Sequence, residues 1–388
     1  MIHFENTGIA FADKSNAYLR KAKWIFKIMS RPFIVKIGSA LLQFAIKIRL
    51  PISWIVKPTV FNHFCGGETI QECEKTIGKL SKSGVQSILD YSAEGLESEK
   101  GFDDTFKTII SIIDKAAENE DIPFAVFKPT GIARFDLLVK VNSKEKLTDE
   151  ETAEFNNVKS RFSHLSAHAA SKDVPLMVDA EESWIQDIVD KLVENEIENH
   201  NTKKPLIFNT VQLYRKDRLE YMKNYCQKAW NNNLFPAFKL VRGAYLEKER
   251  ERAEELNYPS PVHDNKYNTD KDFDAAVKFC LDNSDKMATC IGTHNEESVG
   301  FAVAYMQDMN VPKNNSNIYF SQLLGMSDNI SYGLANQGFN VTKYVPYGPL
   351  KLVMPYLIRR AEENTSVAGQ TSRELQLIKK ELKRRKNI

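Results

Sequence analysis

Cationic, acidic and amide residues follow several short apolar runs of this sequence, and their chemistry suits the binding of an anion. Lys239 and Arg242 end one run and are followed directly by Gly243, where a backbone without a side chain lets a phosphate or another anion approach closely. The residues at the corresponding ends of the other runs are Asp90, Glu94, Lys128, Asp179, Gln212, Tyr214, Thr293, His294, Asn295, Gln322, Leu324, Met326 and Tyr344. Each alone fits a salt bridge or a cap, whereas together they predict a large polar ligand.

A second candidate is the segment YLIRRAEEN, residues 356–364. If it is helical, one face carries an aromatic ring and three charges, because positions i, i+3, i+4 and i+7 are Tyr356, Arg359, Arg360 and Glu363. The ordinary interpretation of such a charge run is a solvated helix surface. The alternative is a face that binds a ligand.

Two prolines indicate where the helix that contains this segment begins. Pro349 follows Gly348 and suits a first helical turn. Pro355 lacks an N–H, so it predicts a kink or a new first turn just before Tyr356. The arginine-bearing segment is therefore expected to be angled separately from the residues that precede it.

Eight short runs rich in Val, Ile and Phe predict the strands that position these residues. They alternate with longer segments of helical spacing, which is typical of an α/β protein with a (β/α)8 barrel. The runs are residues 84–91, 123–128, 175–180, 205–212, 236–243, 287–294, 317–324 and 340–348. The last is the weakest, because Thr342 and Lys343 interrupt it. An open doubly wound sheet is the alternative, although no GxGxxG follows a strand.

The composition is that of a folded globular chain, with 42% hydrophobic and 27% charged residues. Its five cysteines are scattered and form no CxxC pair, so neither a disulfide framework nor a metal site is predicted. Such cysteine use favours a reducing, cytoplasmic location. The first residues do not form a clear signal peptide, because Glu5 and Asp13 precede the basic stretch and no cleavage pattern follows.

The charge of the chain is concentrated near its N-terminus. Residues 14–67 contain ten Lys or Arg and no Asp or Glu, so this arm carries +10 and the chain's net charge of +2 leaves −8 for the rest. The arm interleaves these cations with Trp, Phe and Ile, and its longest uncharged run, residues 37–46, is too short to span a membrane. It predicts peripheral association with an anionic membrane surface at its inner face, or packing of its apolar side on the main domain.

Six motifs of this chain resemble those of the proline dehydrogenase family in its monofunctional form. The motifs, over roughly residues 60–365, are VDAEES, VQLYR, KLVRGAYLEKERERA, GTHN, QLLGMSD and YVPYGPLKLVMPYLIRRAEEN. The resemblance implies a distorted (β/α)8, TIM-like barrel that binds FAD non-covalently. It also implies oxidation of L-proline to 1-pyrroline-5-carboxylate, by hydride transfer from proline C5 to flavin N5, with a membrane quinone as electron acceptor and no nucleic acid partner.

The resemblance also assigns cofactor contacts by position. Gln212 would lie near the isoalloxazine ring and Lys239 near its reactive edge. The remaining contacts would be Arg242, Gly243 and Ala244 along the pyrophosphate, Thr293, His294 and Asn295 toward the adenosine half, and Glu363 on the ribose. Lys239 and Arg242 stand where the bifunctional bacterial members carry Arg and Lys, which keeps the charge but exchanges a forked donor with a point donor.

The substrate contacts implied by the resemblance are Lys128, Asp179, Leu324, Tyr344, Tyr356, Arg359 and Arg360. Asp179 is interpreted as a partner that orients cationic neighbours rather than as a base. Glu94 matches a gate residue that pairs with the first arginine of the RR pair over the filled site. The predicted organisation is a basic helical arm at residues 1–82, a catalytic barrel at 83–365 and a charged helical tail at 366–388.

Three other functions stay open at this point. Hydroxyproline dehydrogenase is a close variant, and the bulk of Tyr344, which would crowd a ring hydroxyl, argues against it. A phosphate-binding barrel enzyme without flavin would purify as a colourless protein. A non-catalytic membrane-surface protein would tolerate replacement of the polar residues at the strand ends.

Overall fold

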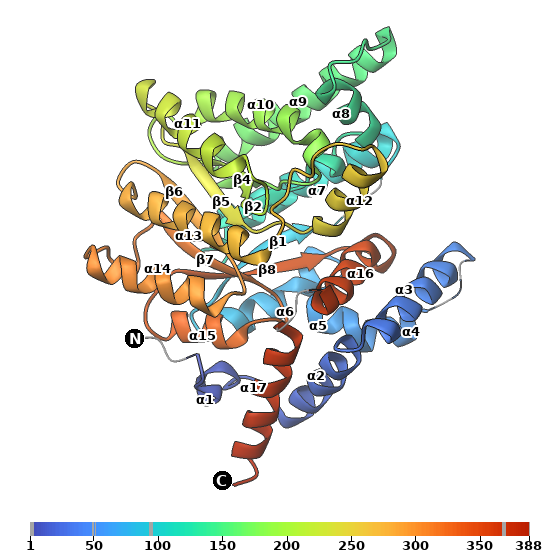
Figure 1. Ribbon diagram of the computed structural model, residues 1–388, viewed down its shortest axis with the longest axis vertical. Coiled ribbons are helices and arrows are strands. Elements are labelled where there is room, and N and C mark those ends of the chain that lie inside the picture. The colour runs from blue at the N-terminus through green and yellow to red at the C-terminus, as the bar shows by residue number, and fades with distance from the viewer. Residues whose placement is uncertain (1–3, 49, 51, 93–95, 367–369, 388) are drawn as a thin grey trace. The chain divides into compact units, whose positions relative to one another are not determined.

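The computed structural model describes residues 4–48, 50, 52–92, 96–366 and 370–387. Eight strands close into one barrel in chain order, β1 to β8, which confirms the predicted (β/α)8 architecture (Figure 1). The strands are β1 (Gln86–Tyr91), β2 (Phe124–Phe127), β3 (Leu176–Val178), β4 (Ile207–Gln212), β5 (Ala237–Val241), β6 (Ala288–Gly292), β7 (Ile318–Leu323) and β8 (Val341–Tyr347). Each lies inside one of the eight predicted runs.

Burial explains why these strands read as continuous apolar runs. Every residue of β2, β3, β4 and β8 is buried, as expected for parallel strands that are covered on both faces. The parallel register aligns the ends of neighbouring strands: Phe127 pairs with Val178, and Thr210 pairs with Lys239. The residue after each strand therefore meets the residue after the next, so Lys128 stands beside Asp179.

The helices follow the strands in alternation, and several begin at side-chain caps. Between β1 and β7 they are α7 (Glu99–Ala117), the short 3-10 helix η2 (Pro129–Gly131), α8 (Phe135–Asn142), α9 (Asp149–Ser171), α10 (Ser183–His200), α11 (Arg218–Asn231), α12 (Leu246–Glu255), α13 (Lys266–Asp282) and α14 (Glu296–Asp308). Thr148 and Glu151 form a capping box at the start of α9, and Ser98 caps α7.

Further helices come from the two ends of the chain. Before β1 lie α1 (Thr7–Ala10), α2 (Asn16–Met29), α3 (Pro32–Lys47), α4 (Ser53–Val56), the π-helix η1 (Lys57–Phe61), α5 (Asn62–Phe64) and α6 (Ile70–Ser81). After β7 lie α15 (Asp328–Ala335), α16 (Leu350–Ser366) and α17 (Gln370–Arg384). In the part of the chain that the structure describes, no helix is long and apolar enough to cross a membrane.

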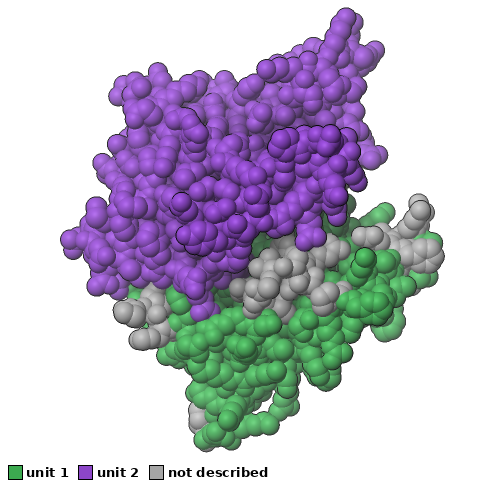
Figure 2. Space-filling model, viewed as in Figure 1, with its two compact units in different colours: residues 1–87, 322–388 green, residues 88–321 purple. Residues whose placement is uncertain are grey.

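Contacts divide the chain into two compact units, coloured separately in Figure 2. Unit 1 combines residues 1–87 with residues 322–388, and unit 2 is the continuous stretch 88–321. These boundaries, after residues 87 and 321, differ from the predicted domain boundaries at residues 82 and 365. Unit 1 has a core of its own in which side chains from both ends of the chain meet, among them Phe26, Phe64, Leu357 and Ile378.

Candidate functional site

Four charged side chains of unit 2, two within β1 and β5 and two directly after β2 and β3, form a continuous chain of ion pairs. The Lys128 ammonium lies 2.9 Å from Asp90 Oδ1 and 3.1 Å from Asp179 Oδ2. The other oxygen of Asp179 accepts a hydrogen bond from Lys239. The structure thus brings together three residues that the sequence placed in the site, and Asp179 contacts both cations, as an orienting partner would.

All four groups of this chain are buried, with 1% to 9% of each residue exposed. Two positive and two negative charges alternate, so each ion finds an opposite charge in a place where water cannot screen it. Burial raises the pKa of Asp90 against the opposing effect of Lys128, and the Asp179 carboxylate raises it further. The arrangement holds both ammonium groups in fixed positions.

The side-chain amide of Gln212, the last residue of β4, forms a hydrogen bond through its nitrogen but, within the described ranges, not through its oxygen. Its Nε2 donates to the backbone oxygen of Glu181 at 2.9 Å, which fixes the orientation of the side chain. Its Oε1 is buried and has no hydrogen-bond partner among the described residues. A buried amide oxygen without a donor costs free energy unless a ligand supplies one, so it fits a ligand with an N–H group.

Arg242 is held at three of its five N–H groups. It donates from Nε to Asp270 at 2.7 Å, from one terminal nitrogen to Thr293 at 2.6 Å and from the other to Ser298 at 2.8 Å. A guanidinium has two N–H groups on each terminal nitrogen, so one on each has no partner among the residues described here. Arg242 and Thr293 are thereby brought together, with donors left for an anion.

Gly243 is required by the close approach of its neighbour. Its φ is +123°, and a Cβ at this position would lie 2.4 Å from the ring of Tyr214. The backbone N–H of Tyr214 donates to the Arg242 oxygen at 2.7 Å, which keeps the loops after β4 and β5 together. Ala244 follows and is partly exposed. A side chain at Gly243 would therefore push apart the loops that carry Gln212 and Arg242.

The GTHN motif ends β6 and begins α14. Thr293 is buried, whereas His294 and Asn295 are half-buried. The Oδ1 of Asn295 accepts from the backbone N–H groups of Glu297 and Ser298, at 2.8 and 3.3 Å, and so caps the helix. Asn295 therefore has a structural role that the sequence prediction did not include, and it leaves only its Nδ2 for a ligand.

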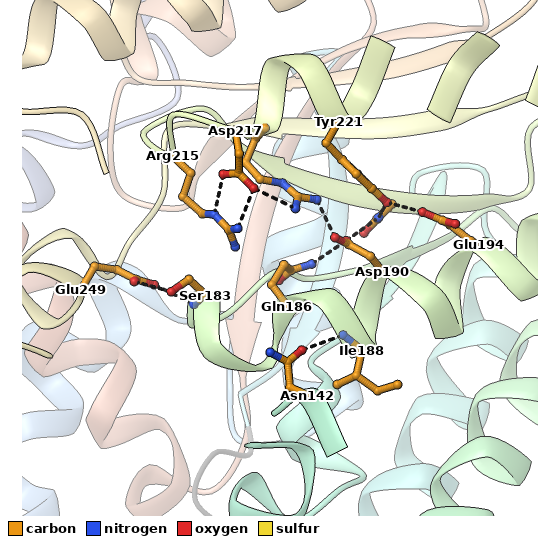
Figure 3. A network of polar contacts seen from close by, with 12 residues as sticks. Asn142, Ser183, Gln186, Ile188, Asp190, Glu194, Arg215, Asp217, Tyr221 and Glu249 are labelled. Atoms are coloured by element: carbon orange, nitrogen blue, oxygen red, sulfur yellow. Dashed lines mark hydrogen bonds and ion pairs between the residues drawn. The ribbon is translucent and has the colours of Figure 1, made fainter. Parts of the chain in front are cut away.

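A buried polar network fixes the segment between β4 and α11 (Figure 3). Asp190 of α10 accepts from Arg218 at 2.6 Å and from Gln186 at 2.8 Å. Arg215 and Asp217 form a two-point ion pair within the loop, at 3.0 and 2.7 Å. These contacts leave the strand end that carries Gln212 little freedom to move.

Glu249 of α12 anchors the segment that follows Ala244. Its two oxygens accept from the backbone N–H of Ser183 at 2.7 Å and from the Ser183 hydroxyl at 2.6 Å, as Figure 3 shows. Glu249 is fully buried in spite of its place in the charged run LEKERERAEE. The motif KLVRGAYLEKERERA therefore contains a buried positioning residue, although its many charged residues predict an exposed segment.

In unit 1, two predicted site residues are joined through their backbones. The N–H of Leu324, after β7, donates to the oxygen of Tyr344 in β8 at 2.9 Å. Lys343, which has no exposed surface, lies 2.9 Å from Asp328, and Lys14 lies 3.5 Å from the same carboxylate. Three charged residues from three segments thus form a cluster at Lys343, the residue before Tyr344.

Helix α16 contains the RR pair. It begins at Leu350, directly after Pro349, as predicted, and it runs through Pro355, so the predicted alternative of a new first turn before Tyr356 is wrong and the predicted kink stays a prediction. Tyr356 is buried, and the Arg360 guanidinium lies 5.4 Å from the centre of its ring. This face is therefore not the simple solvated surface of the ordinary interpretation.

Two predicted site residues cannot be placed in the same way. Glu94 lies outside the described residues. Glu363 lies on helix α16, and its side chain is outside the described part of the structure. Their roles as gate and ribose contact stay predictions.

Comparison with known proteins gives the family. A family model described as "Proline dehydrogenase" matches residues 73–373. The chain belongs to the proline dehydrogenase family. This confirms the resemblance drawn from the motifs.

Three relatives show the range of this family. The chain is 31% identical to proline dehydrogenase 1, mitochondrial, of Dictyostelium discoideum, over 98% of this chain and 74% of that protein. It is 34% identical to the carbapenem antibiotics biosynthesis protein CarD of Pectobacterium carotovorum subsp. carotovorum, over 83% of each. It is 28% identical to hydroxyproline dehydrogenase of Xenopus laevis, over 99% of this chain and 90% of that one.

A solved structure supports the fold of this family member. Proline utilization A of Bdellovibrio bacteriovorus, inactivated by N-propargylglycine, superposes with a TM-score of 0.71 at 20% identity. The match covers 95% of this chain and 40% of that longer protein. At this identity the likeness concerns the barrel and not its ligands.

Two buried acidic residues of this proline dehydrogenase family chain were not predicted as partners of other polar groups. Glu181 accepts from the backbone N–H and the hydroxyl of Thr130, at 2.9 and 2.7 Å, and its own backbone binds Gln212. Asp328 pairs with two lysines in unit 1. A usable signal existed for Glu181, because it lies two residues after Asp179 at a strand end, but nothing local marks Asp328 as buried.

Proposed function

We propose that this chain is an FAD-dependent proline dehydrogenase that oxidises L-proline to 1-pyrroline-5-carboxylate and passes electrons to a membrane quinone. The observation that carries the proposal is the buried chain Asp90, Lys128, Asp179 and Lys239. It is supported by membership of the proline dehydrogenase family. When bound, FAD would supply the acceptor for the hydride from proline C5.

The residues of unit 2 fit a flavin nucleotide in three respects. Gln212 offers a buried amide oxygen that lacks a donor among the described residues, which suits an N–H of the ring system. Arg242 retains two N–H groups for an anion, which suits the pyrophosphate. Lys239 is held by Asp179, so its ammonium group stands in a fixed position. Thr293, His294, Ala244 and the remaining predicted cofactor residues would complete the contacts.

The resemblance to the family supports the proposed substrate contacts, position by position. Arg359 and Arg360 would bind the proline carboxylate, since two guanidinium groups are the donors best suited to a carboxylate. Tyr356, Leu324 and Tyr344 would pack on the ring. Lys128 and Asp179 would keep the charge balance of the substrate contacts, and Glu94 is the proposed gate residue. In this proposal the protein contributes orientation and electrostatics, and no protein nucleophile is needed.

Hydroxyproline is the second candidate substrate, and the observation that favours it is the similarity to a hydroxyproline dehydrogenase over nearly the whole chain. Tyr344 argues for proline, because it is only 7% exposed and its bulk would crowd a ring hydroxyl. The ratio of kcat/KM for proline and for hydroxyproline decides between the two substrates.

Electron delivery to a quinone requires contact with a membrane. The arm at residues 14–67 has a charge of +10 and supports attachment to an anionic surface without a spanning helix. We propose peripheral association through this arm at the inner face of the membrane.

The visible spectrum of the purified protein tests the cofactor. We expect yellow flavin absorbance in the wild type and its loss in the double variant Lys239→Met with Arg242→Met, because both charges proposed for FAD binding are removed. A matched control replaces two exposed lysines, Lys75→Met with Lys107→Met, and should keep the absorbance. A colourless wild type would contradict the flavin, and full absorbance in the double variant would contradict the roles of these two residues.

A further inference from the structure

A basic groove lies between two helices from opposite ends of the chain, α2 and α17, both in unit 1. Its volume is about 520 Å³. Its lining residues are Asn16, Arg20, Lys23, Trp24, Lys379, Leu382, Lys383, Arg385 and Lys386. Six of these are cations and none is an acid, so the groove is complementary to an anion. The proposed reaction does not use any of them.

Five of the six cations are available to a ligand. Among the described residues, no carboxylate lies within ion-pair distance of Arg20, Lys23, Lys379, Lys383 or Lys386. Arg385 differs, because it donates to Glu381 and to two backbone oxygens, and so it holds the groove in shape. The described acids of α17, Glu374 and Glu381, are buried and bound within unit 1.

The groove borders a surface of exposed apolar side chains. Trp24 lines it with 62% of its surface exposed, and the Lys27 ammonium lies 4.9 Å from the centre of its ring. On α3, the exposed residues Phe33, Ile34, Ile37 and Leu41 follow helical spacing, whereas Val35 is buried. Of the large hydrophobic residues that are exposed in the described parts of the chain, ten lie between residues 24 and 55, and the other three are Leu256, Tyr267 and Met309.

We propose that the groove between α2 and α17 binds the phosphate headgroup of an anionic lipid while Trp24 and the exposed face of α3 enter the bilayer interface. Cations without carboxylate partners neutralise the phosphate, and the apolar side chains beside them leave water for the acyl boundary. A nucleic acid would use the same cations but would leave the aliphatic side chains of α3 in water. The inference deepens the proposed membrane attachment by naming its site, and it adds the C-terminal helix to the N-terminal arm.

Co-sedimentation with vesicles tests the site. The purified full-length protein is mixed with phosphatidylcholine vesicles, with and without phosphatidylglycerol, at low and high salt. We expect binding only to the anionic vesicles and release by salt. The double variant Lys379→Glu with Lys383→Glu should bind roughly 100-fold more weakly, because two charges are reversed at the groove.

A matched control exists on another helix of unit 1. Lys75 and Lys79 of α6 are exposed and four residues apart, and Lys79 lies in the last helical turn. Lys379 and Lys383 have the same exposure and spacing on α17, and Lys383 lies in its last turn. Lys75→Glu with Lys79→Glu changes the net charge equally and should keep vesicle binding. Equal losses in both double variants would show that only net charge matters and would overturn the assignment of the groove.

Three further measurements distinguish a lipid headgroup from free phosphate and from nucleic acid. Trp24→Phe should remove most of the blue shift in tryptophan emission that anionic vesicles cause in the wild type. If inorganic phosphate displaces the vesicles at matched ionic strength with chloride, the groove is a soluble phosphate site and the lipid proposal fails. Tighter binding to an oligonucleotide than to anionic vesicles, with loss in the α17 double variant, would overturn it in favour of nucleic acid.

The proposed enzyme activity is tested in separate samples. Proline oxidation by the wild type is measured with a soluble artificial acceptor and without lipid. If this activity is absent while vesicle binding depends on the groove, the proposed function fails and the lipid site stands. If the activity is present while vesicle binding ignores the groove, the lipid site fails alone.

Discussion

His63 is an uncharged histidine in a fully packed place. Its Nε2 donates to the backbone oxygen of Gly325 at 3.1 Å, and its ring stacks on Tyr18 and meets the edges of Phe26 and Phe64. Gly325 has a φ of +80°, and a Cβ there would lie 2.4 Å from the His63 oxygen. Burial lowers the pKa of His63 to about 4. The folded state therefore disfavours protonation of the His63 ring.

This pKa predicts a loss of stability in acid. The unfolded chain takes up a proton near pH 6.5 and the folded state only near pH 4, so the stabilising contribution is present above 6.5 and is lost as the pH falls through this window. Between pH 7.5 and pH 5 we expect a decrease of about 2 kcal/mol from this group. His63→Gln keeps an N–H donor without titrating, so its free energy of unfolding in urea should change less over the same range.

The exposed His164 on α9 provides the control, since His164→Gln should keep the pH dependence of the wild type. An unchanged pH dependence in His63→Gln would show that His63 is not the group responsible.

At the scale of single residues, the sequence indicated contacts where chemistry and position agreed. Asp179 and Lys128 follow strands in register, and their charges meet. The sequence did not predict ion pairs between residues that lie far apart in the chain. Lys343 looked like an interruption of the eighth strand, but it is buried against Asp328, which makes a lysine compatible with a buried strand.

Helix α16 is the element on which the substrate proposal depends most. Each arginine is half-buried, and Tyr356 is buried with the Arg360 guanidinium over its ring. A charged hydrogen bond to a desolvated carboxylate contributes roughly 1.5 to 3 kcal/mol. Arg359→Met or Arg360→Met should therefore weaken proline binding about 10-fold to 150-fold, with FAD retained. Lys replacements should give intermediate values, because the charge remains and the forked geometry is lost.

Steady-state kinetics with proline and an artificial acceptor measures this effect. Lys351→Met on the same helix is the control, since Lys351 is exposed and outside the predicted face. Near-normal kcat/KM in both arginine variants would return this face to the interpretation of a solvated surface.

At the scale of elements, the strands were easier to predict than the helix ends. All eight runs contain strands, because strands covered on both faces must be apolar over their whole length. Helix α16 runs through Pro355, although proline removes a donor and disfavours a helix interior. The packing of Val353, Met354 and Leu357 in the unit 1 core supplies the stabilisation that local preference lacks.

At the scale of the whole molecule, unit 1 joins segments that are more than 300 residues apart in sequence. The sequence predicted a basic arm and a charged tail as separate ends. It did not predict that α17 packs against α2, because the pairing depends on tertiary contacts and leaves no periodic signal. The same pairing creates the basic groove, which neither helix forms alone.

Arg385 is the residue that should hold the two ends together. It donates to the backbone oxygens of Phe11 at 2.6 Å and Lys14 at 2.7 Å, and also to Glu381, whereas the neighbouring Arg384 donates to Glu381 within α17. Arg385→Ala removes a donor from both carbonyl groups, although that of Phe11 keeps the Lys14 N–H at 3.1 Å, and the loss costs about 1 to 3 kcal/mol. We expect the amides of α1 and α2 to exchange hydrogen about 5-fold to 150-fold faster in this variant, as read by mass spectrometry. Arg384→Ala removes the same charge and should leave that exchange within about 2-fold of the wild type, because Arg384 binds only within α17 and Arg385 still pairs with Glu381. Equal exchange in the two variants would mean that the ends are joined by apolar packing alone.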